Sequence, residues 1–199
     1  MITATPRPAP PSFVRSAREG DAPALTALSE PFARSGALRA RPASLYATRA
    51  ADFLVLQTPD GEIEGCVGLS VHDCAPAPDL ASGPALASPP GPASGSSASD
   101  LTPGGSASGL VGNRRQVGVL YNFCVADHRQ GRGAGAQLLR AALHEARAQF
   151  LDALFTATTG DGNVFIRHGF TPASERLAPP SWAKSLDPRR NAQVFVRAL

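Results

Sequence analysis

A glycine-rich turn between an apolar strand and a helix constrains the fold of this chain more than any other feature of its sequence. The strand runs from Gln116 to Val125, the turn Gln130-Gly131-Arg132-Gly133-Ala134-Gly135 follows it, and an amphipathic helix continues to about Gln149. Glycines ahead of a helix leave several backbone N–H groups unpaired and pointing in one direction, and the helix N-terminus adds about half a positive charge. The segment therefore predicts an α/β fold with an anion site suited to a phosphate or pyrophosphate.

Three interpretations of this turn stay open. The first is the binding of an acyl-CoA pyrophosphate, which depends on a resemblance described below. The second is a dinucleotide fold, because Gly131, Gly133 and Ala136 satisfy that fingerprint. Against it, about five residues separate the turn from the strand, and the next strand, which begins at Asp152, ends without the acidic residue that would bind the ribose. The third is an ordinary turn in a glycine-rich chain. A nucleotide-hydrolase loop is excluded, because no Gly-Lys-Ser/Thr follows.

Composition narrows the class of protein. The chain has 199 residues, of which 43% are hydrophobic, and this suits one α/β domain with a core of its own. Its net charge of +3 comes from dispersed residues without interleaved aromatics, which disfavours a nucleic-acid surface and suits anionic ligands. Three cysteines without metal-ligand spacing, no signal peptide and no membrane-spanning segment predict a cytoplasmic protein without a metal. We expect a monomer or homodimer.

Hydrophobic periodicity predicts the other elements. Strands are expected at 13–17, 52–58, 63–71 and 151–158, and in a last hairpin that begins at 170 and ends at 193–197. Helices are expected after Asp21, a predicted N-cap, and at 42–50 and 162–168, with one more helical turn starting at 179–180. Residues 1–11 are predicted to be a disordered tail. Residues from about 75 to 113, nearly all Ala, Pro, Gly and Ser, are predicted to be a disordered loop inserted into a single domain over 12–199.

The strand before the glycine turn has apolar residues on both faces, as expected of a central strand. Simple alternation places Val117, Val119, Tyr121, Phe123 and Val125 on one face, and Leu120 and Cys124 on the other. The whole pattern predicts a mixed central sheet of about seven strands with helices on both faces, and the glycine turn at its middle.

The order of these elements, the Gln130–Gly135 turn and Phe165-Ile-Arg-His-Gly169-Phe170 resemble the GCN5-related N-acetyltransferase (GNAT) superfamily from about Ser12 to Leu199, outside the low-complexity loop. Residues 60–66 and 154–159 and the closing Arg190-Asn191 resemble N-acetylglutamate synthases and amino-acid-analogue acetyltransferases. The resemblance implies the GNAT fold, acetyl-CoA as co-substrate, and direct acetyl transfer to the primary amine of a small molecule, an amino acid or analogue. Two alternatives stay open: a protein or peptide N-acetyltransferase, and a non-catalytic acyl-CoA-binding regulatory module.

The same resemblance assigns site residues. It implies that Phe123, Cys124 and Val125 offer backbone groups to pantetheine, and that Gln130, Gly131, Arg132, Gly133, Ala134 and Gly135 hold the pyrophosphate. Arg190 is implied to bind a substrate carboxylate, although the Ser and Lys that N-acetylglutamate synthases carry nearby are absent.

The usual acid and base are not visible in this sequence. The place of the family's usual Glu base holds Val119, and the place of its Tyr acid holds Phe165. Candidates for catalysis are therefore Asn122 on the central strand, and His72 and Asp73 at the end of the preceding strand.

Overall fold

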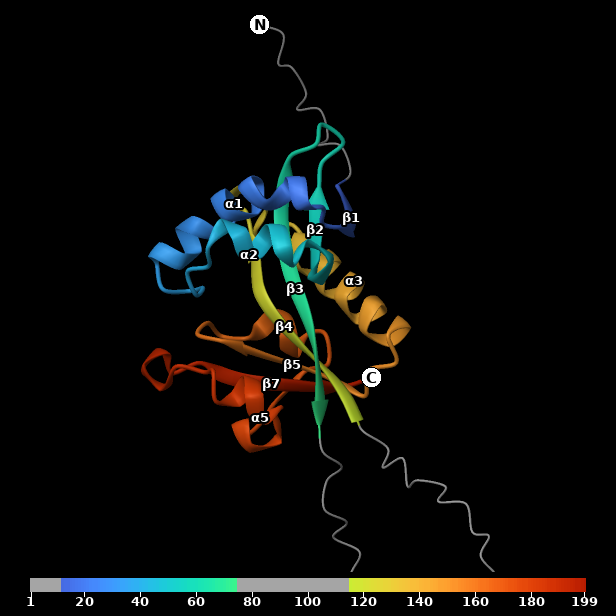
Figure 1. Cartoon of the computed structure of the whole chain (residues 1–199), viewed down its shortest axis with the longest axis vertical. Helices are drawn as coiled ribbons and strands as arrows, with labels where there is room; N and C mark the ends of the chain where they lie inside the picture. Colours follow the sequence, from blue (N-terminus) through green and yellow to red (C-terminus); the bar gives the residue numbers. More distant parts are fainter. Residues whose placement is uncertain (1–11, 75–114) are drawn as a thin grey trace, which may run out of the picture. The chain divides into compact units, whose positions relative to one another are not determined.

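A computed structural model describes residues 12–74 and 115–199 of the chain. The predicted tail at 1–11 and the predicted loop at about 75–113 lie outside the described residues. The described residues form a seven-stranded sheet in the order β1-β2-β3-β4-β5-β7-β6 (Figure 1). Only the β4–β5 pair is parallel, so the sheet is mixed, as predicted.

The strands coincide with the apolar segments of the sequence. They are β1 (Phe13–Ser16), β2 (Phe53–Gln57), β3 (Ile63–Cys74), β4 (Arg115–Val125), β5 (Ala153–Thr158), β6 (Thr171–Pro172) and β7 (Gln193–Ala198). β3 is longer than predicted, because His72, Asp73 and Cys74 continue the ladder with the start of β4.

The helices also lie where the periodicity places them. They are α1 (Ala22–Arg34), α2 (Ala43–Thr48), α3 (Ala134–Ala148), α4 (Asn163–Ile166) and α5 (Pro180–Ala183). α2 is shorter than the predicted helix at 42–50, because residues 50–52 form a separate 3₁₀ turn that leads into β2.

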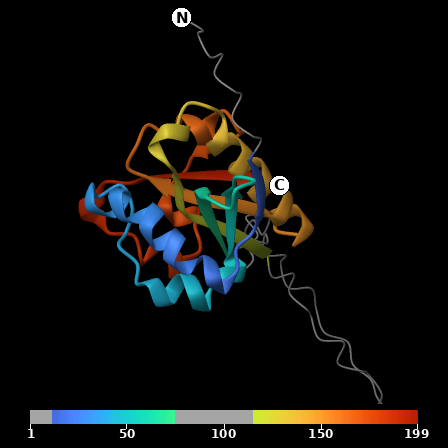
Figure 2. The ribbon, with the colours of Figure 1, turned by 90° about the horizontal axis from the view of Figure 1, so that it is seen from above.

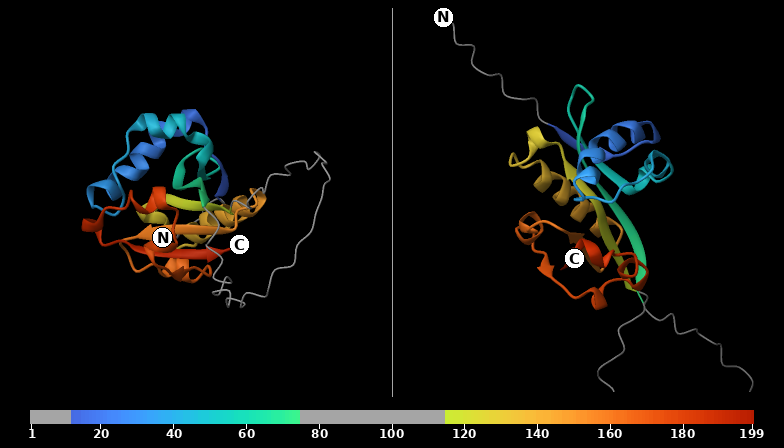
Figure 3. Two further views of the ribbon diagram at one scale, coloured as in Figure 1. Left: turned by 60° about the horizontal axis from the view of Figure 1, so that its bottom comes forward. Right: turned by 90° about the vertical axis from the view of Figure 1, so that its left-hand side faces the viewer.

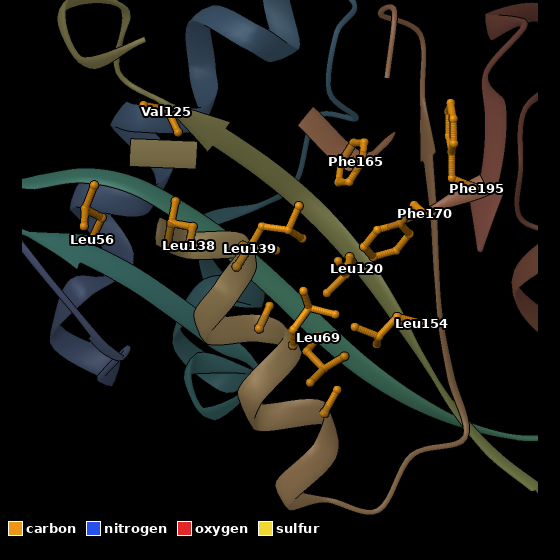
Figure 4. Packing of buried hydrophobic residues seen from close by; sticks show 14 of the residues in the cluster. Leu56, Leu69, Leu120, Val125, Leu138, Leu139, Leu154, Phe165, Phe170 and Phe195 are labelled. Atoms are coloured by element: carbon orange, nitrogen blue, oxygen red, sulfur yellow. The ribbon is translucent and has the colours of Figure 1, made fainter. Parts of the chain in front are cut away.

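Helices cover both faces of the sheet (Figures 2 and 3). On one face, Leu138 and Leu139 of α3 are fully buried against the sheet, in a core completed by Phe165, Phe170 and Phe195 (Figure 4). Burial of each such side chain contributes about 1.5–3 kcal/mol. On the opposite face α1 and α2 form a second core over β2, β3 and β4, and α5 packs over β4, β5 and β7.

A bulge interrupts β4 at Asn122. Gly68 of β3 pairs with Tyr121 and Cys66 pairs with Cys124, so that two residues of β4 oppose one residue of β3. Asn122 takes up the extra length with a left-handed backbone, at φ 51°. An extra residue reverses the alternation of side chains beyond it.

The predicted faces of β4 were therefore wrong beyond Tyr121. Phe123 and Val125 pack in the α3 core with Leu120, whereas Cys124 packs with Tyr121 on the face of α1 and α2. β4 thus contributes side chains to the cores on both faces of the sheet, and it ends next to the glycine turn.

Asp21 stands at the N-cap position of α1, as predicted. Its carboxylate makes no capping hydrogen bond to the helix. It accepts hydrogen bonds of 2.7 and 3.0 Å from the Arg15 guanidinium and one of 2.7 Å from the Arg18 N–H. These bonds, that from Arg15 above all, lower the pKa of Asp21. The Asp21 side chain therefore ties β1 to the start of α1.

Candidate functional site

The glycine turn leaves a row of backbone N–H groups free at the start of α3. Gly131 and Gly133 adopt left-handed conformations, at φ 71° and 86°, which glycine reaches without strain. A Cβ at either position would meet no atom within 4 Å. Within the described part of the chain, the N–H groups of Gly131 and of residues 133–136 have no backbone acceptor, and the first turn of α3 holds no acidic residue. This end of α3 is therefore open to an anion.

Side chains around the turn divide into fixed and free ones. The Gln130 amide donates to the Val125 carbonyl at 3.0 Å and to Asp127 Oδ1 at 2.9 Å, which fixes the turn to the end of β4. Arg129 Nε lies 3.1 Å from the carboxylate of Glu64, which is buried, so this guanidinium is already paired. Arg132 is exposed and forms no ion pair with any residue that the structure describes. It is the arginine of the turn that is free to contact a phosphate.

β4 and β5 diverge just before the turn. They pair from Val117 to Leu120, and β4 then continues to Val125 without a partner on that side among the described strands (Figure 1). The backbone of this stretch has no strand beside it on that side among the described residues, and such an unpaired edge suits a peptide-like ligand chain. Phe123 connects this edge to the turn, since a Cβ on Gly135 would lie 3.3 Å from the Phe123 ring.

The Cys124 side chain points into the core. It is 3% exposed, and its Sγ lies 3.5 Å from Cys66 Sγ and 3.9 Å from Ser29 Oγ. The hydrogen bond between the two thiols, together with burial, raises the pKa of Cys66. The Cys124 thiol therefore belongs to the core on the face of α1 and α2.

A cavity of about 360 Å³ lies on the face of α1, α2 and α5. β3, β4 and β5 line it with Ser70, His72, Val119–Asn122 and Ala157, and two segments at 37–49 and 181–192 complete the wall. Because it includes Leu120, Tyr121 and Asn122, the cavity begins where β4 leaves β5.

The charge of this cavity is mainly positive. Among the described residues that line it, the charged ones are Arg39, Arg41, Arg49, Arg190 and one carboxylate, Asp187. Arg39 donates to the carbonyl of Ser185 at 2.6 Å, and Arg190 donates to the carbonyls of Gly36 and Ala37, both at 2.8 Å. Arg39 and Arg190 thus tie the two wall segments together.

Arg41 keeps a free donor. Its guanidinium lies over the Tyr121 ring, 4.8 Å from the centroid, and its Nε is buried without a hydrogen-bond partner among the described residues. Burial lowers the pKa of Arg41, but a guanidinium stays protonated at neutral pH. A half-buried guanidinium with an unused donor is suited to a carboxylate.

Tyr121 is held on the wall of the same cavity. Burial, followed by the carboxylate of Asp52, raises the pKa of Tyr121 to about 12, so the phenol stays protonated at neutral pH. Gly68 makes room for the ring, because a Cβ there would lie 2.5 Å from Tyr121 Cζ.

The three candidates for catalysis differ in position. His72 lines the cavity, with Nε2 3.0 Å from Ser70 Oγ and Nδ1 3.2 Å from Ser181 Oγ. Asp73 is exposed, does not line the cavity and accepts a hydrogen bond from Gln116 Nε2 at 3.3 Å.

Asn122 lines the cavity too, but its side-chain amide is directed at core partners. It donates to Ser29 Oγ at 3.0 Å and to Cys66 Sγ at 3.5 Å, and it accepts from the Tyr46 hydroxyl at 3.3 Å. The amide therefore holds the bulge in place.

Phe165 and Val119, which the resemblance sets at the places of an acid and a base, have apolar surroundings. Phe165 is buried, and its ring centroid lies 5.4–6.2 Å from those of Phe123, Phe170 and Phe195. Figure 4 shows Phe165 in the same core as Phe170 and Phe195. Val119 is buried below the cavity at 1% exposure. Neither residue can carry a proton.

Sequence reasoning missed Arg41, Arg49, Tyr121 and Ser70. The arginines lie in loops or at a helix end, where charge is usual, and only the tertiary fold brings them to the cavity. A signal existed for Tyr121 alone: an aromatic residue with a hydroxyl next to an Asn in an otherwise apolar strand.

Metal and membrane features can be judged over residues 12–74 and 115–199. There, no group of three or more His, Cys, Asp or Glu is placed to hold a metal ion. Nor is any helix in these ranges both long and apolar enough to cross a membrane.

Comparison with known proteins gives a family and several relatives. The model of the Acetyltransferase (GNAT) family matches residues 24–170, more than half of the chain. An amino-acid acetyltransferase of Ectopseudomonas mendocina (strain ymp) is 40% identical over 73 residues, which are 37% of this chain and 17% of that protein. An amino-acid acetyltransferase of Neisseria meningitidis is 24% identical over 94% of this chain and 34% of its own length. The chain thus spans about a third of the length of these relatives at most.

Solved structures show the same fold. N-acetylglutamate synthase from Neisseria gonorrhoeae, complexed with coenzyme A and N-acetyl-glutamate, has a TM-score of 0.67 and 24% identity, over 94% of this chain and 35% of that one. Rv2747 from Mycobacterium tuberculosis, in complex with CoA, has a TM-score of 0.61 and 18% identity, over 94% of this chain and 99% of that one.

Proposed function

This chain belongs to the acetyltransferase (GNAT) family, and from that premise we propose that it transfers the acetyl group of acetyl-CoA to the primary amine of an amino acid or amino-acid analogue. The observation that carries the proposal is the order of three features along one short segment of the chain. The free N–H groups at the start of α3, the unpaired edge of β4 and the arginine-lined cavity follow one another along residues 120–136.

The anion site at the glycine turn fits the pyrophosphate of CoA. The N–H groups of Gly131 and of residues 133–136 are the donors, and Arg132 adds a charge beside them. The unpaired edge of β4 at Phe123–Val125 offers backbone groups to the amide-containing pantetheine arm. Acetyl-CoA supplies the thioester, and we assign to one N–H of this edge the polarisation of the thioester carbonyl.

The cavity fits an amine that carries a carboxylate. Arg41 presents a buried, unused donor and Arg49 adds a second positive charge, while Arg39 and Arg190 are engaged with carbonyls of the wall. We therefore assign the binding of the substrate carboxylate to Arg41, in place of Arg190, to which the resemblance gave that role. Arg190 instead links the two wall segments of the cavity. Anchoring the carboxylate orients the amine toward the β4 edge, which lowers the entropic cost of reaction.

The names of the relatives support an amino acid as the substrate. The curated relatives are amino-acid acetyltransferases, and one structural neighbour is complexed with N-acetyl-glutamate. The free thiols of Cys66, Cys74 and Cys124 agree with a reducing, cytoplasmic location. We propose that the protein acts there as a monomer or homodimer.

Release of CoA from acetyl-CoA tests the function. The acceptors are a panel of free amino acids, the methyl ester of each, and short peptides. We expect turnover with one or more amino acids and at least about tenfold lower kcat/KM with the matching ester, since a hydrogen bond to a charged group contributes about 1.5–3 kcal/mol. Faster turnover with peptides would support a peptide acetyltransferase instead. Acetyl-CoA binding without turnover would leave a regulatory module.

A further inference from the structure

His72 lies in the cavity between two hydroxyl groups. Its Nε2 is 3.0 Å from Ser70 Oγ, and its Nδ1 is 3.2 Å from Ser181 Oγ of α5. Ser70 has a longer alternative, the Val119 carbonyl at 3.5 Å. The two contacts hold the ring between the two hydroxyl groups. In the tautomer with its proton on Nδ1, the Ser70 hydroxyl donates to Nε2 and Nδ1–H donates to Ser181, and this is the tautomer that can accept a proton from Ser70.

The register of the sheet places this pair beside the position that lacks a carboxylate. Ser70 is the direct partner of Val119, and His72 is the partner of Val117, across the antiparallel β3–β4 ladder. Direct partners project from the same face with Cβ atoms about 4.5–5.5 Å apart. Ser70 Oγ therefore lies one strand away from the side chain of Val119, on the face that lines the cavity.

We propose that His72 accepts the proton of the substrate ammonium, with Ser70 as the relay and Ser181 as a positioning residue. This inference rests on the proposed acetyl transfer and gives the chain a base where Val119 provides none.

The charges around the ring favour its neutral form. Burial, and next the charge of Arg49, lower the pKa of His72. Other charged or titratable groups of the cavity are Arg39 and Arg41 from the loop before α2, Tyr121 from β4, and Asp187 and Arg190 from the segment after α5. The positive groups outnumber the single carboxylate. An imidazole that is neutral at pH 7 is ready to accept a proton.

In the proposed reaction the proton moves from the ammonium to His72 through the Ser70 hydroxyl. The ammonium gives one proton to Ser70 Oγ while the Ser70 proton moves to His72 Nε2. The freed amine lone pair attacks the thioester carbonyl carbon, the C–N bond forms, and the C–S bond breaks with its electron pair on sulfur. The thiolate takes a second proton from the amine nitrogen, and His72 returns its proton to solvent. The products are the acetylated amine, CoA and one proton.

The test compares His72→Gln and His72→Ala with His144→Gln, a control on the exposed surface of α3. The probe acceptor is the amino acid that supports the fastest CoA release in the panel. In the wild type, kcat/KM should fall on the acid side with a midpoint below the ordinary histidine value of about 6.5. His72→Gln should lower kcat by about 10²-fold or more and remove this acid limb, with acetyl-CoA affinity unchanged. Added imidazole should restore part of the rate to His72→Ala.

Substitutions of Ser70 give an independent test of the proposal. Ser70→Ala should lower kcat and displace the acid limb, and Ser70→Thr, which keeps the hydroxyl, should restore both. Calorimetric titration with acetyl-CoA shows whether each variant is folded, and if His72→Gln is not, the Ser70 pair decides the case.

Two results would contradict the proposal in different ways. If the wild type is active and His72→Gln keeps both the acid limb and a kcat within about threefold, where loss of general-base catalysis predicts far more, the base lies elsewhere. If no amine in the panel is acetylated, the proposed function fails and the role of His72 with it.

Discussion

Arg41 is the residue of the cavity that is best suited to bind a carboxylate. Its guanidinium stacks on Tyr121, yet its buried Nε has no acceptor in the described part of the chain. A buried donor without an acceptor costs about 1–3 kcal/mol, and a substrate carboxylate would remove that cost.

Arg41→Gln should raise KM for the amino acid by about 10–100-fold and leave KM for acetyl-CoA unchanged, because a charge-assisted hydrogen bond contributes about 1.5–3 kcal/mol. Arg140→Gln, on the exposed surface of α3, is the control. Initial-rate kinetics with both substrates varied would show this. An equal loss for the amino acid and its methyl ester would mean that Arg41 does not contact the carboxylate.

Cys124 tests whether transfer is direct. The thiol is buried, and its hydrogen-bond partners among the described residues are the Cys66 thiol and the Ser29 hydroxyl, so Cys124→Ala should cost about 1–2 kcal/mol in stability and keep most of the turnover. Denaturant unfolding and steady-state rates measure the two effects, with Cys74→Ala as the matched control. Intact-mass spectrometry after incubation with acetyl-CoA alone should find no acetyl adduct. A stoichiometric adduct on Cys124, with an inactive alanine variant, would establish an acetyl-enzyme instead.

At the scale of elements, the turn before α3 depends on two glycines with positive φ. Gly133→Asp should weaken acetyl-CoA binding at least about tenfold more than Gly133→Asn, because like charges brought together cost several kcal/mol. Both side chains tolerate left-handed backbone comparably, and neither Cβ meets a neighbour, so both variants should fold. Calorimetric titration with acetyl-CoA measures the affinities. Equal affinities of the two variants would rule out a phosphate at this turn.

Most elements could be predicted from the sequence, because each has a clear period and a clear boundary. β4 is the exception that matters. Its apolar residues alternate through Asn122 without a visible break, and the bulge that reverses their faces is set by contacts of Asn122 with Ser29, Tyr46 and Cys66, which lie far away in the chain. Local pattern contains no information on such partners.

The acetyl-CoA side of the candidate site could be predicted from the sequence, whereas the acceptor side could not. The glycine turn and the end of β4 form one continuous segment, so a motif could locate them. The acceptor cavity joins segments near residues 40, 70, 120 and 185. Arg41 and Ser70 could not be recognised before the sheet brought these segments together, and Arg190 could not be distinguished from a residue that links the two wall segments.

At the scale of the whole molecule, we propose that residues 12–199 form one domain and that its interruption is dispensable. Cys74 and Arg115 are direct partners at the ends of β3 and β4, so a short Gly/Ser linker in place of residues 78–110 can close the hairpin. Turnover and melting temperature should stay near the wild-type values. A large fall in either would show that the replaced residues belong to the site or the core.

The two wall segments of the cavity, 37–49 and 181–192, lie apart in the chain from the glycine turn at 130–135. Substitutions can therefore accumulate in those two segments without changing the backbone N–H groups of the glycine turn that bind acetyl-CoA. A descendant of this chain can drift to a new acceptor while it inherits acetyl-CoA binding intact. The hydrogen bonds that Arg39 and Arg190 donate from each segment to carbonyls of the other limit this change, because a substitution in one segment that breaks them also disturbs the other segment.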